Sequence, residues 1–367
     1  PPQPPFQNID EAPASGYEEA MVFEDRRGLR YERINNTGER PGMRSGAAAI
    51  ASRLVHAIGY RTPPVWIVRD EEGERFAAMR WPLGIDLGPT STKNRRDDDA
   101  NDQLDHVDRR SLRSLALLAA WLDIGRIEPR MLRDVYVGKP GKGHIQHYVV
   151  GLDLALGVGN YESAVHFARD PDRERKNFFL RMFSMGLSPK PPPYLPKTRW
   201  PHVGLISERV SPKSYDPSPP FEPFDRRNAA DDYWFAKQLT RLSRAVIADA
   251  VQAAGLSPVE QNWLFQVLLL RRDQVVAKAM KGVTPCEALG LETKEGSHTL
   301  LLRDLTQKPA RSQAVSYRVE LLNGEGDQLH TSTTTTHDSD FALPLSTSAL
   351  SHGYLVMRIW RQGRERP

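Results

Sequence analysis

The sequence predicts an α+β protein that ends in a small all-β sandwich. Three observations support this fold class. Short β-rich segments flank one helix in the first 85 residues, residues 229–281 carry helical periodicity, and the composition turns β-rich after about residue 296. With 367 residues, the chain is long enough for two or three domains.

The charge balance and the hydropathy exclude several functional classes. The net charge is +4 and no dense basic stripe with interleaved aromatics occurs, so we expect no nucleic-acid partner. The longest apolar runs, such as LALLAAWL, fall short of the roughly 18 residues that a membrane span needs. We therefore expect no transmembrane segment, which leaves peripheral association with a cell envelope open. The single cysteine, Cys286, excludes an intramolecular disulfide and a cysteine-based metal cluster.

The N-terminal segment 1–18 is rich in proline and poor in apolar residues. It predicts an extended arm, either a solvent-exposed tail or a strap that docks on another protein. The chain begins Pro-Pro-Gln-Pro-Pro rather than with Met. Such a start follows a cleaved export signal or lipid anchor, which would make the protein exported or periplasmic, although a trimmed chain would look the same.

Residues 19–85 predict a small sheet with one packed helix. The helix spans 44–58, with Ser45 as a candidate N-cap and Gly59 at its end, because glycine adopts the left-handed conformation most easily. The strands expected around this helix are two joined by a hairpin at 25–28, one at 62–68, and one at 73–81 that pairs with it.

Residues 84–110 read as a charged connector. Asp97, Asp98, Asp99 and Asp102 could suggest a calcium loop, but the run lacks the spacing and the terminal Glu of an EF-hand. We therefore expect no metal there.

An amphipathic helix at 111–122 is followed by strands at 134–138 and 145–151. The turn GKPGKG between the strands lacks the phosphate-binding pattern G-x-x-x-x-G-K-[ST] and opens no helix, so it predicts a hairpin. His144 and His147 are three residues apart, which on a strand puts them on opposite faces and disfavours a metal site.

Residues 184–227 combine many prolines with interleaved aromatics. They predict an ordered loop pinned to the surface, with PPPYLP as an alternative polyproline ligand for a partner domain. A long helix should then cover 229–254, and a second 258–281. Ser257 as N-cap, Pro258 at the first helical position and Glu260 at the third form a strong start signal for that second helix.

The C-terminal part, 291–367, predicts the sandwich, with a boundary between 285 and 296. The five strands expected there are HTLLLRD, AVSYRVELL, QLHTSTTTT, FALPL and GYLVMRIWR. Nothing in this part forms a catalytic cluster.

The first 282 residues resemble an atypical kinase-like family of bacterial proteins, distantly similar to HipA-like and phosphoinositide-kinase-like folds. The matching segments are RSGAAAIASRLVHAIGYRTPP, RRDDDANDQLDHVDRRSLRSL, AAWLDI, RDVYVG, HYVVGLDLALG, AADDYWFAKQLTRLS and LLLRRDQV. The resemblance implies a two-lobed atypical protein-kinase-like domain, with 19–85 as the small lobe and 86–290 as the helical lobe, followed by the sandwich.

The resemblance also implies where phosphotransfer residues would stand. Such proteins use a loop Asp, an Asn five residues later and a second Asp shortly before a Leu-Gly pair, and the Asn and the second Asp hold magnesium. Counted through the matching segments, these positions fall on Arg126, Met131 and Gly151. The nucleotide-gripping Lys aligns with Arg33. The catalytic positions are therefore degraded.

A shifted register could still rescue activity. Asp153 lies two residues after Gly151, on the same side if this segment is a strand, and Asp123 lies three residues before Arg126. Together they could form a distorted magnesium site.

The leading hypothesis is a catalytically inactive kinase-like protein, a pseudokinase, that acts as a structural or interaction subunit of a larger assembly. It needs no cofactor or metal, and its partners are other protein subunits. One alternative is a divergent atypical kinase that uses Asp123 and Asp153. The other is a protein that binds a surface or a carbohydrate through its C-terminal sandwich.

Overall fold

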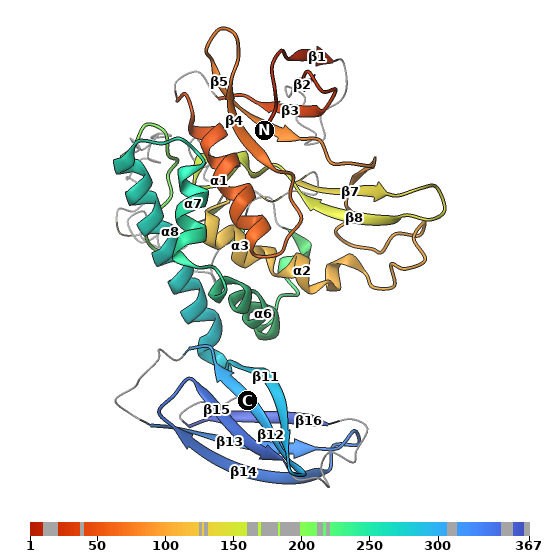
Figure 1. The fold of residues 1–367 in the computed structure, drawn as a ribbon, viewed down its shortest axis with the longest axis vertical. Coiled ribbons are helices and arrows are strands. Elements are labelled where there is room, and N and C mark those ends of the chain that lie inside the picture. The colour runs from red at the N-terminus through yellow and green to blue at the C-terminus, as the bar shows by residue number, and fades with distance from the viewer. Residues whose placement is uncertain are drawn as a thin grey trace. The chain divides into compact units, whose positions relative to one another are not determined.

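The computed structural model describes residues 1–9, 21–36, 40–124, 127, 131–159, 168–169, 183, 199–210, 216–217, 221–306, 314–345 and 355–362. These residues form two compact units. One comprises Pro1–Asp231 with Arg241–Val275, and the other Asp232–Thr240 with Val276–Pro367. The structure is mixed α and β, with several small sheets (Figure 1).

The first unit begins with a five-stranded antiparallel sheet in the order β1-β2-β3-β5-β4. Its strands are β1 (Gln7–Ile9), β2 (Met21–Glu24), β3 (Arg30–Ile34), β4 (Val65–Arg69) and β5 (Arg75–Arg80). The predicted hairpin at 25–28 is confirmed, as Gly28 donates to the carbonyl of Asp25 at 2.8 Å and adopts a positive φ of 69°. The predicted pairing of the next two strands is also confirmed.

Strand β1 corrects the prediction that residues 1–18 form an extended arm, either exposed to solvent or docked on another protein. Residues 7–9 pair with β2, and the Phe6 ring lies 5.2 Å from Phe23 and 6.3 Å from Phe76 between centroids. In this proline-rich segment, the single aromatic side chain of Phe6 packs on rings of the sheet, and the residues that follow it add a strand to the same sheet. Residues 10–18 of the predicted arm lie outside the described residues.

Helix α1 (Met43–Ala57) covers one face of this sheet and confirms the predicted helix. The core between them is small-residue-rich, which lets helix and sheet approach closely; it comprises Ile34, Ala48, Ala49, Val65, Ala77 and Met79. The prediction that Ser45 caps the helix is wrong, because Gly42 occupies the N-cap position. The Asn36 side chain supplies the acceptor instead, at 3.1 Å from the Ser45 amide. Gly59 ends the helix at a φ of 96°, as expected.

A three-stranded antiparallel sheet follows, in the order β6-β7-β8. It comprises β6 (Ile85–Pro89), β7 (Leu132–Val137) and β8 (His144–Val149). The predicted hairpin is confirmed; Tyr136 closes its turn by accepting from the Gly143 amide at 2.8 Å. Two expectations are wrong: residues 85–89 are a strand and not a connector, and the second hairpin strand stops at Val149 rather than at 151.

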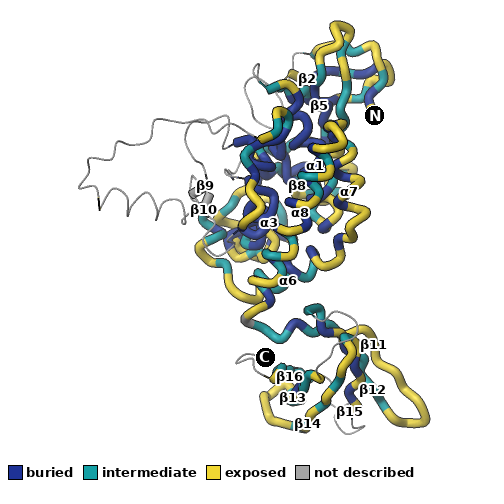
Figure 2. Tube along the Cα trace, turned by 90° about the vertical axis from the view of Figure 1, so that its left-hand side faces the viewer, coloured by how far each residue is buried: buried dark blue, intermediate teal, exposed yellow. Residues whose placement is uncertain are grey.

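The buried helix of this unit is α3 (Leu115–Leu122). The predicted helix at 111–122 divides at Ser114, with the short α2 (Arg110–Arg113) before it. Helix α3 is not amphipathic: LALLAAWL has no charged side chain, and every residue of α3 is buried (Figure 2). A helix that is apolar on all sides belongs in the centre of a core.

The other described helices are α6 (Ala229–Thr240), most of which belongs to the second unit, α7 (Arg244–Gln252), and α8 (Pro258–Ala279), whose last residues also belong to the second unit. The prediction of one helix over 229–254 is wrong, because Ser243 has extended backbone and its hydroxyl caps the Val246 amide at 3.2 Å. The predicted start of α8 is confirmed by reciprocal hydrogen bonds between Ser257 and Glu260, 3.0 Å from the Ser257 amide and 3.4 Å from the Glu260 amide.

Short elements complete the first unit. They are the 3₁₀ turns η1 (His106–Asp108), η3 (Leu152–Leu154) and η4 (Glu222–Phe224), and the paired β9 (Ala168–Arg169) and β10 (Asp216–Pro217). Of the predicted Pro-rich loop, residues 184–198, 211–215 and 218–220 lie outside the described part, including PPPYLP.

The second unit contains two three-stranded sheets. One has the order β11-β12-β15, from β11 (Cys286–Lys294), β12 (Ser297–Asp304) and β15 (Asp340–Leu345); the other has the order β14-β13-β16, from β14 (Gln328–Thr336), β13 (Val315–Leu322) and β16 (Val356–Arg361). The turn η5 (Met280–Gly282) precedes them. Tyr317 from one sheet stacks on Phe341 from the other at 4.4 Å, so the sheets pack face to face as a sandwich. The sequence missed β11.

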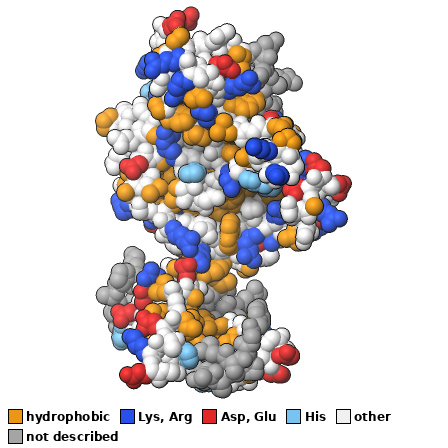
Figure 3. All heavy atoms as spheres, turned by 45° about the vertical axis from the view of Figure 1, so that its right-hand side comes forward, with side chains coloured by type: hydrophobic (Ala, Val, Ile, Leu, Met, Phe, Trp, Pro, Cys, Tyr) orange, Lys and Arg blue, Asp and Glu red, His pale blue; other side chains and the backbone are white. Residues whose placement is uncertain are grey.

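Side chains of both signs are interspersed on the face seen in Figure 3, in keeping with the small net charge. Among the described residues, none of the helices has the length and hydropathy to cross a bilayer.

Candidate functional site

Three of the predicted site residues, Asp123, Gly151 and Asp153, lie where α3 and β8 end. Of the degraded positions, Met131 is 4% exposed and stands at the start of β7, where its carbonyl accepts from the Val150 amide at 2.8 Å. Met131 is thus a core residue between two backbone segments. Arg126 lies outside the described residues.

Gly151 has a left-handed backbone, with a φ of 67°, and forms the N-cap of η3. The expectation that Gly151 and Asp153 share one side of a strand is therefore wrong. The physical reason is the glycine itself, which admits the positive φ that turns the chain from β8 into a 3₁₀ turn. Asp153 then sits inside this turn.

Asp153 is buried, with 1% of its surface exposed, and it is paired with Arg44 from the first turn of α1. Arg44 donates from Nε to the Asp153 Oδ2 atom at 3.0 Å, and its Nη2 makes a second, shorter bond to the same oxygen. A guanidinium donating twice gives a strong, charge-assisted contact. The carboxylate charge of Asp153 is thus balanced by an arginine that lies 109 positions away in the sequence.

Asp123 is the residue that ends α3. It has a left-handed φ of 52° and is 8% exposed. Its carbonyl accepts from the Gly157 amide at 3.1 Å, and the Leu122 carbonyl accepts from the Leu156 amide at 2.6 Å. The segment after Asp153 is therefore attached to the end of α3, and the two fallback aspartates belong to one neighbourhood of the fold.

A tight backbone crossing fixes this segment. A Cβ on Gly157 would lie 2.5 Å from the Ile206 amide nitrogen, and a Cβ on Gly204 would lie 2.5 Å from the Leu156 carbonyl oxygen. Gly157 also has a φ of 74°, and its carbonyl accepts from the Leu205 amide at 3.1 Å. The pair Leu156-Gly157, from which the expected position of the metal-binding Asp is counted, thus has a packing role of its own.

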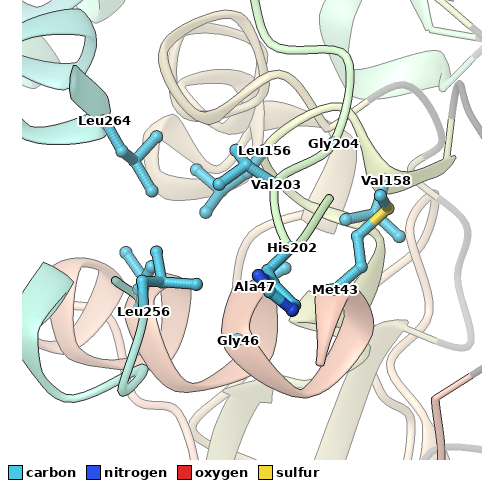
Figure 4. A pocket seen from close by; sticks show the side chains of 11 residues that line it. Met43, Gly46, Ala47, Leu156, Val158, His202, Val203, Gly204, Leu256 and Leu264 are labelled. Atoms are coloured by element: carbon cyan, nitrogen blue, oxygen red, sulfur yellow. The ribbon is translucent and has the colours of Figure 1, made fainter. Parts of the chain in front are cut away.

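A small cavity lies beside this crossing (Figure 4). It lies among α1, the turn after η3, the loop at 202–204 and the start of α8. Its labelled lining side chains are mostly apolar: Met43, Ala47, Leu156, Val158, His202, Val203, Leu256 and Leu264. The volume is about 10 Å³, close to what one water molecule needs and far below the roughly 300 Å³ of a small-molecule site. Side chains fill this part of the fold.

Arg33, at the expected nucleotide-Lys position, is engaged by the turn between β4 and β5. It donates to Asp70 at 2.8 Å and to Glu74 at 3.0 Å. Its guanidinium also lies 4.1 Å from the centre of the Phe76 ring. Two carboxylates and an aromatic ring hold Arg33 against the sheet.

Sequence reasoning missed a buried ionic network under the sheet β6-β7-β8. Asp134 on β7 is fully buried and accepts from His147 Nδ1 at 2.7 Å and from Arg96 at 2.9 Å, as well as from the Thr90 hydroxyl. Burial alone would raise the pKa of Asp134, but the hydrogen bonds from His147 and Thr90, with that from Arg96, outweigh it and hold the pKa at about 2.

The predicted connector supplies the second half of this network. His106 is fully buried and pairs through Nε2 with Asp102 at 2.7 Å, and Arg109 donates to the same carboxylate. The rings of His106 and His147 meet edge to face at 5.6 Å. The acidic run therefore anchors the connector by ion pairs. In the sequence, the only indication of this ionic network was the high density of Asp, Arg and His. Such a density does not show which side chains pair with one another.

No group of three His, Cys, Asp or Glu side chains within the described ranges could hold a metal ion. His144 and His147 accordingly do not form such a group there.

A comparison with solved structures finds a weak structural similarity. The chain is similar to the crystal structure of a Helicobacter pylori proinflammatory kinase, CtkA, with a TM-score of 0.39 and 10% sequence identity, over 71% of this chain and 91% of that chain. A likeness at this level says nothing of function. No protein-family model and no curated protein matches the sequence.

Proposed function

We propose that this chain is a kinase-like protein without phosphotransfer activity that serves as a structural or interaction subunit of a larger assembly. The observation that carries the proposal is the ion pair between Arg44 and the buried Asp153.

The pair matters because a magnesium ligand must offer its negative charge to the metal. Asp153 already has a cation within hydrogen-bond distance, at 3.0 Å from Arg44 Nε. A second cation at such a site meets a repulsion of about 4 kcal/mol per unit charge at 4 Å in a partly screened environment. Magnesium would therefore have to displace an arginine from a site where both charges are sheltered from water.

The other degraded positions support the same reading. Gly151 has no side chain and forms a turn, Met131 is a core residue, and Arg33 is held by Asp70 and Glu74. Phosphotransfer depends on metal-borne charge stabilisation, which is the largest catalytic contribution to that chemistry. Among the described residues, the carboxylates at or near these positions are Asp153, which is paired with Arg44, and Asp123, which ends α3 with a left-handed backbone.

Two measurements test the proposal. In a phosphotransfer assay with labelled ATP and magnesium, we expect the purified chain to label neither itself nor a generic protein substrate. Labelling that disappears in Asp153→Asn would overturn the inactive assignment and favour a divergent kinase. For the subunit role, we expect this 41.4 kDa chain, expressed with a tag in its source cells and extracted gently, to elute well above its own mass. Elution as a free 41.4 kDa chain would contradict that role.

A further inference from the structure

The outer face of the sheet β14-β13-β16 carries a regular set of polar side chains. On β13, Tyr317 and Val319 point into the sandwich core, so Ser316, Arg318 and Glu320 point outward. The strand register extends these three residues into rows across the sheet. The rows are Ser316 with Thr335, Arg318 with Thr333 and Trp360, and Glu320 with Thr331 and Arg358.

These rows form a face of hydroxyls, two guanidiniums, one carboxylate and one indole. Thr331, Thr333 and Thr335 are exposed and alternate along β14, so their side chains repeat about every 6.7 Å on one side. Each hydroxyl can both donate and accept a hydrogen bond. The three rows contain no aliphatic side chain, which sets this face apart from the apolar centre of a stable protein interface.

Arg318 is held in place at the middle of the face. Its guanidinium lies 4.5 Å from the centre of the Trp360 ring and 3.5 Å from the Glu320 carboxylate, yet 55% of its side chain is exposed. Glu320 is largely covered, with 18% of its side chain exposed. Arg358 is exposed one row away. The surface therefore offers two outward guanidiniums against one largely covered carboxylate, with the central guanidinium already oriented.

We propose that this face binds an acidic polysaccharide strand. Exposed carboxylates of the glycan would pair with Arg318 and Arg358, since guanidinium and carboxylate form parallel hydrogen bonds. Sugar hydroxyls would bond to the threonine row, and the Trp360 edge would supply an amphipathic contact. This glycan-binding proposal does not depend on whether the chain has phosphotransfer activity, because it rests on residues of the second unit alone.

The test uses the full chain and three probes: oligogalacturonate as the acidic glycan, dextran as a neutral glycan, and poly-glutamate as an acidic peptide. Calorimetric titration should show binding of oligogalacturonate that weakens as salt rises, and affinities for dextran and poly-glutamate at least tenfold lower. Arg318→Gln should lower the affinity for oligogalacturonate at least tenfold, and Thr333→Val about threefold.

The matched control is Arg303→Gln. Arg303 lies on β12 of the opposite sheet, is likewise half exposed, and is paired with Asp340 at 2.6 Å, so its loss should leave glycan affinity unchanged. Because Arg318 and Thr333 are exposed, both variants should melt at the wild-type temperature. No binding of oligogalacturonate, equal binding of dextran or poly-glutamate, or equal loss in the Arg303 variant would each overturn the proposal.

Discussion

Replacing Arg271 by leucine should strongly destabilise the first unit, because this buried side chain joins α8 to two other segments, the end of α3 and the loop at 207–209. Arg271 on α8 is 2% exposed. Its Nε donates to the Trp121 carbonyl at 2.8 Å, and its Nη2 donates to the Ala120 carbonyl. These are carbonyls of the last turn of α3, which have no partner within their own helix. The Nη1 group donates to the Ser207 carbonyl at 2.7 Å.

The magnitude follows from what the substitution leaves behind. Each buried acceptor that loses its donor costs about 1–3 kcal/mol, and a cation at a helix C-terminus adds about 1 kcal/mol through the helix dipole. The leucine side chain offsets part of this loss of folding free energy because it buries apolar surface. We therefore expect a net loss of about 4 kcal/mol, which corresponds to a fall in melting temperature of about 10 °C for a unit of this size.

Urea unfolding followed by Trp fluorescence measures this loss. The control is Arg226→Leu, since Arg226 is 55% exposed and pairs with Asp108 at the surface, where the expected cost is below about 1 kcal/mol. An Arg271→Leu chain that unfolds within about 1 kcal/mol of wild type would refute the assigned role of the arginine.

Two further outcomes follow from the site. The pKa of Asp134 is lowered from 3.8 to about 2, so its charge stabilises the fold above pH 3.8, and this contribution disappears as the pH falls through about 2. Asp134→Asn should thus cost about 2 kcal/mol at pH 7, and urea titrations should show the difference shrinking between pH 4 and pH 2; a constant difference would contradict this. Gly157→Ala should cost more than 2 kcal/mol, as its Cβ would lie 2.5 Å from the Ile206 amide nitrogen at a φ of 74°. Gly59→Ala, at a φ of 96° with open space around the Cβ, should cost only about 1 kcal/mol. Equal losses of stability in the two variants would contradict the tight backbone crossing at Gly157.

Local signals in the sequence predicted local structure well. The start of α8 could be predicted because the capping residues lie next to one another in the sequence. Ser257 and Glu260 cap each other's backbone amides, and Pro258 has no amide that needs a partner. The end of α1 was readable because Gly59 alone can take the required backbone turn. Such devices act within four residues, so a linear pattern contains all the information they need.

Features that depend on distant partners were not readable. Strand β1 lies in a proline-rich segment with no strand pattern, and it forms because Phe6 meets aromatic rings on the sheet. The break between α6 and α7 depends on Ser243, whose hydroxyl serves equally well inside or at the start of a helix until packing decides. In both cases the intrinsic secondary-structure propensity of the residues predicts the observed structure only weakly.

The candidate site shows the same difference between local features, which the sequence predicts, and contacts between distant residues, which it does not. The sequence indicated that Asp153 could replace a missing ligand, but it could not show that Arg44 would be the residue facing it across 109 positions. The same holds for Asp134 and His147, whose pairing depends on the register of one hairpin. A carboxylate's role is set by its neighbours in space, and these are fixed only when the strands are paired.

The most direct test of the central claim is binding of ATP with magnesium, followed as thermal stabilisation of the wild-type chain. A ligand at one hundred times its Kd would add about 2.7 kcal/mol of stability, which a melting curve detects easily. With Asp153 neutralised by Arg44, we expect the melting temperature to be the same with ATP, with magnesium and with both. A magnesium-dependent rise that Asp153→Asn abolishes would contradict the account.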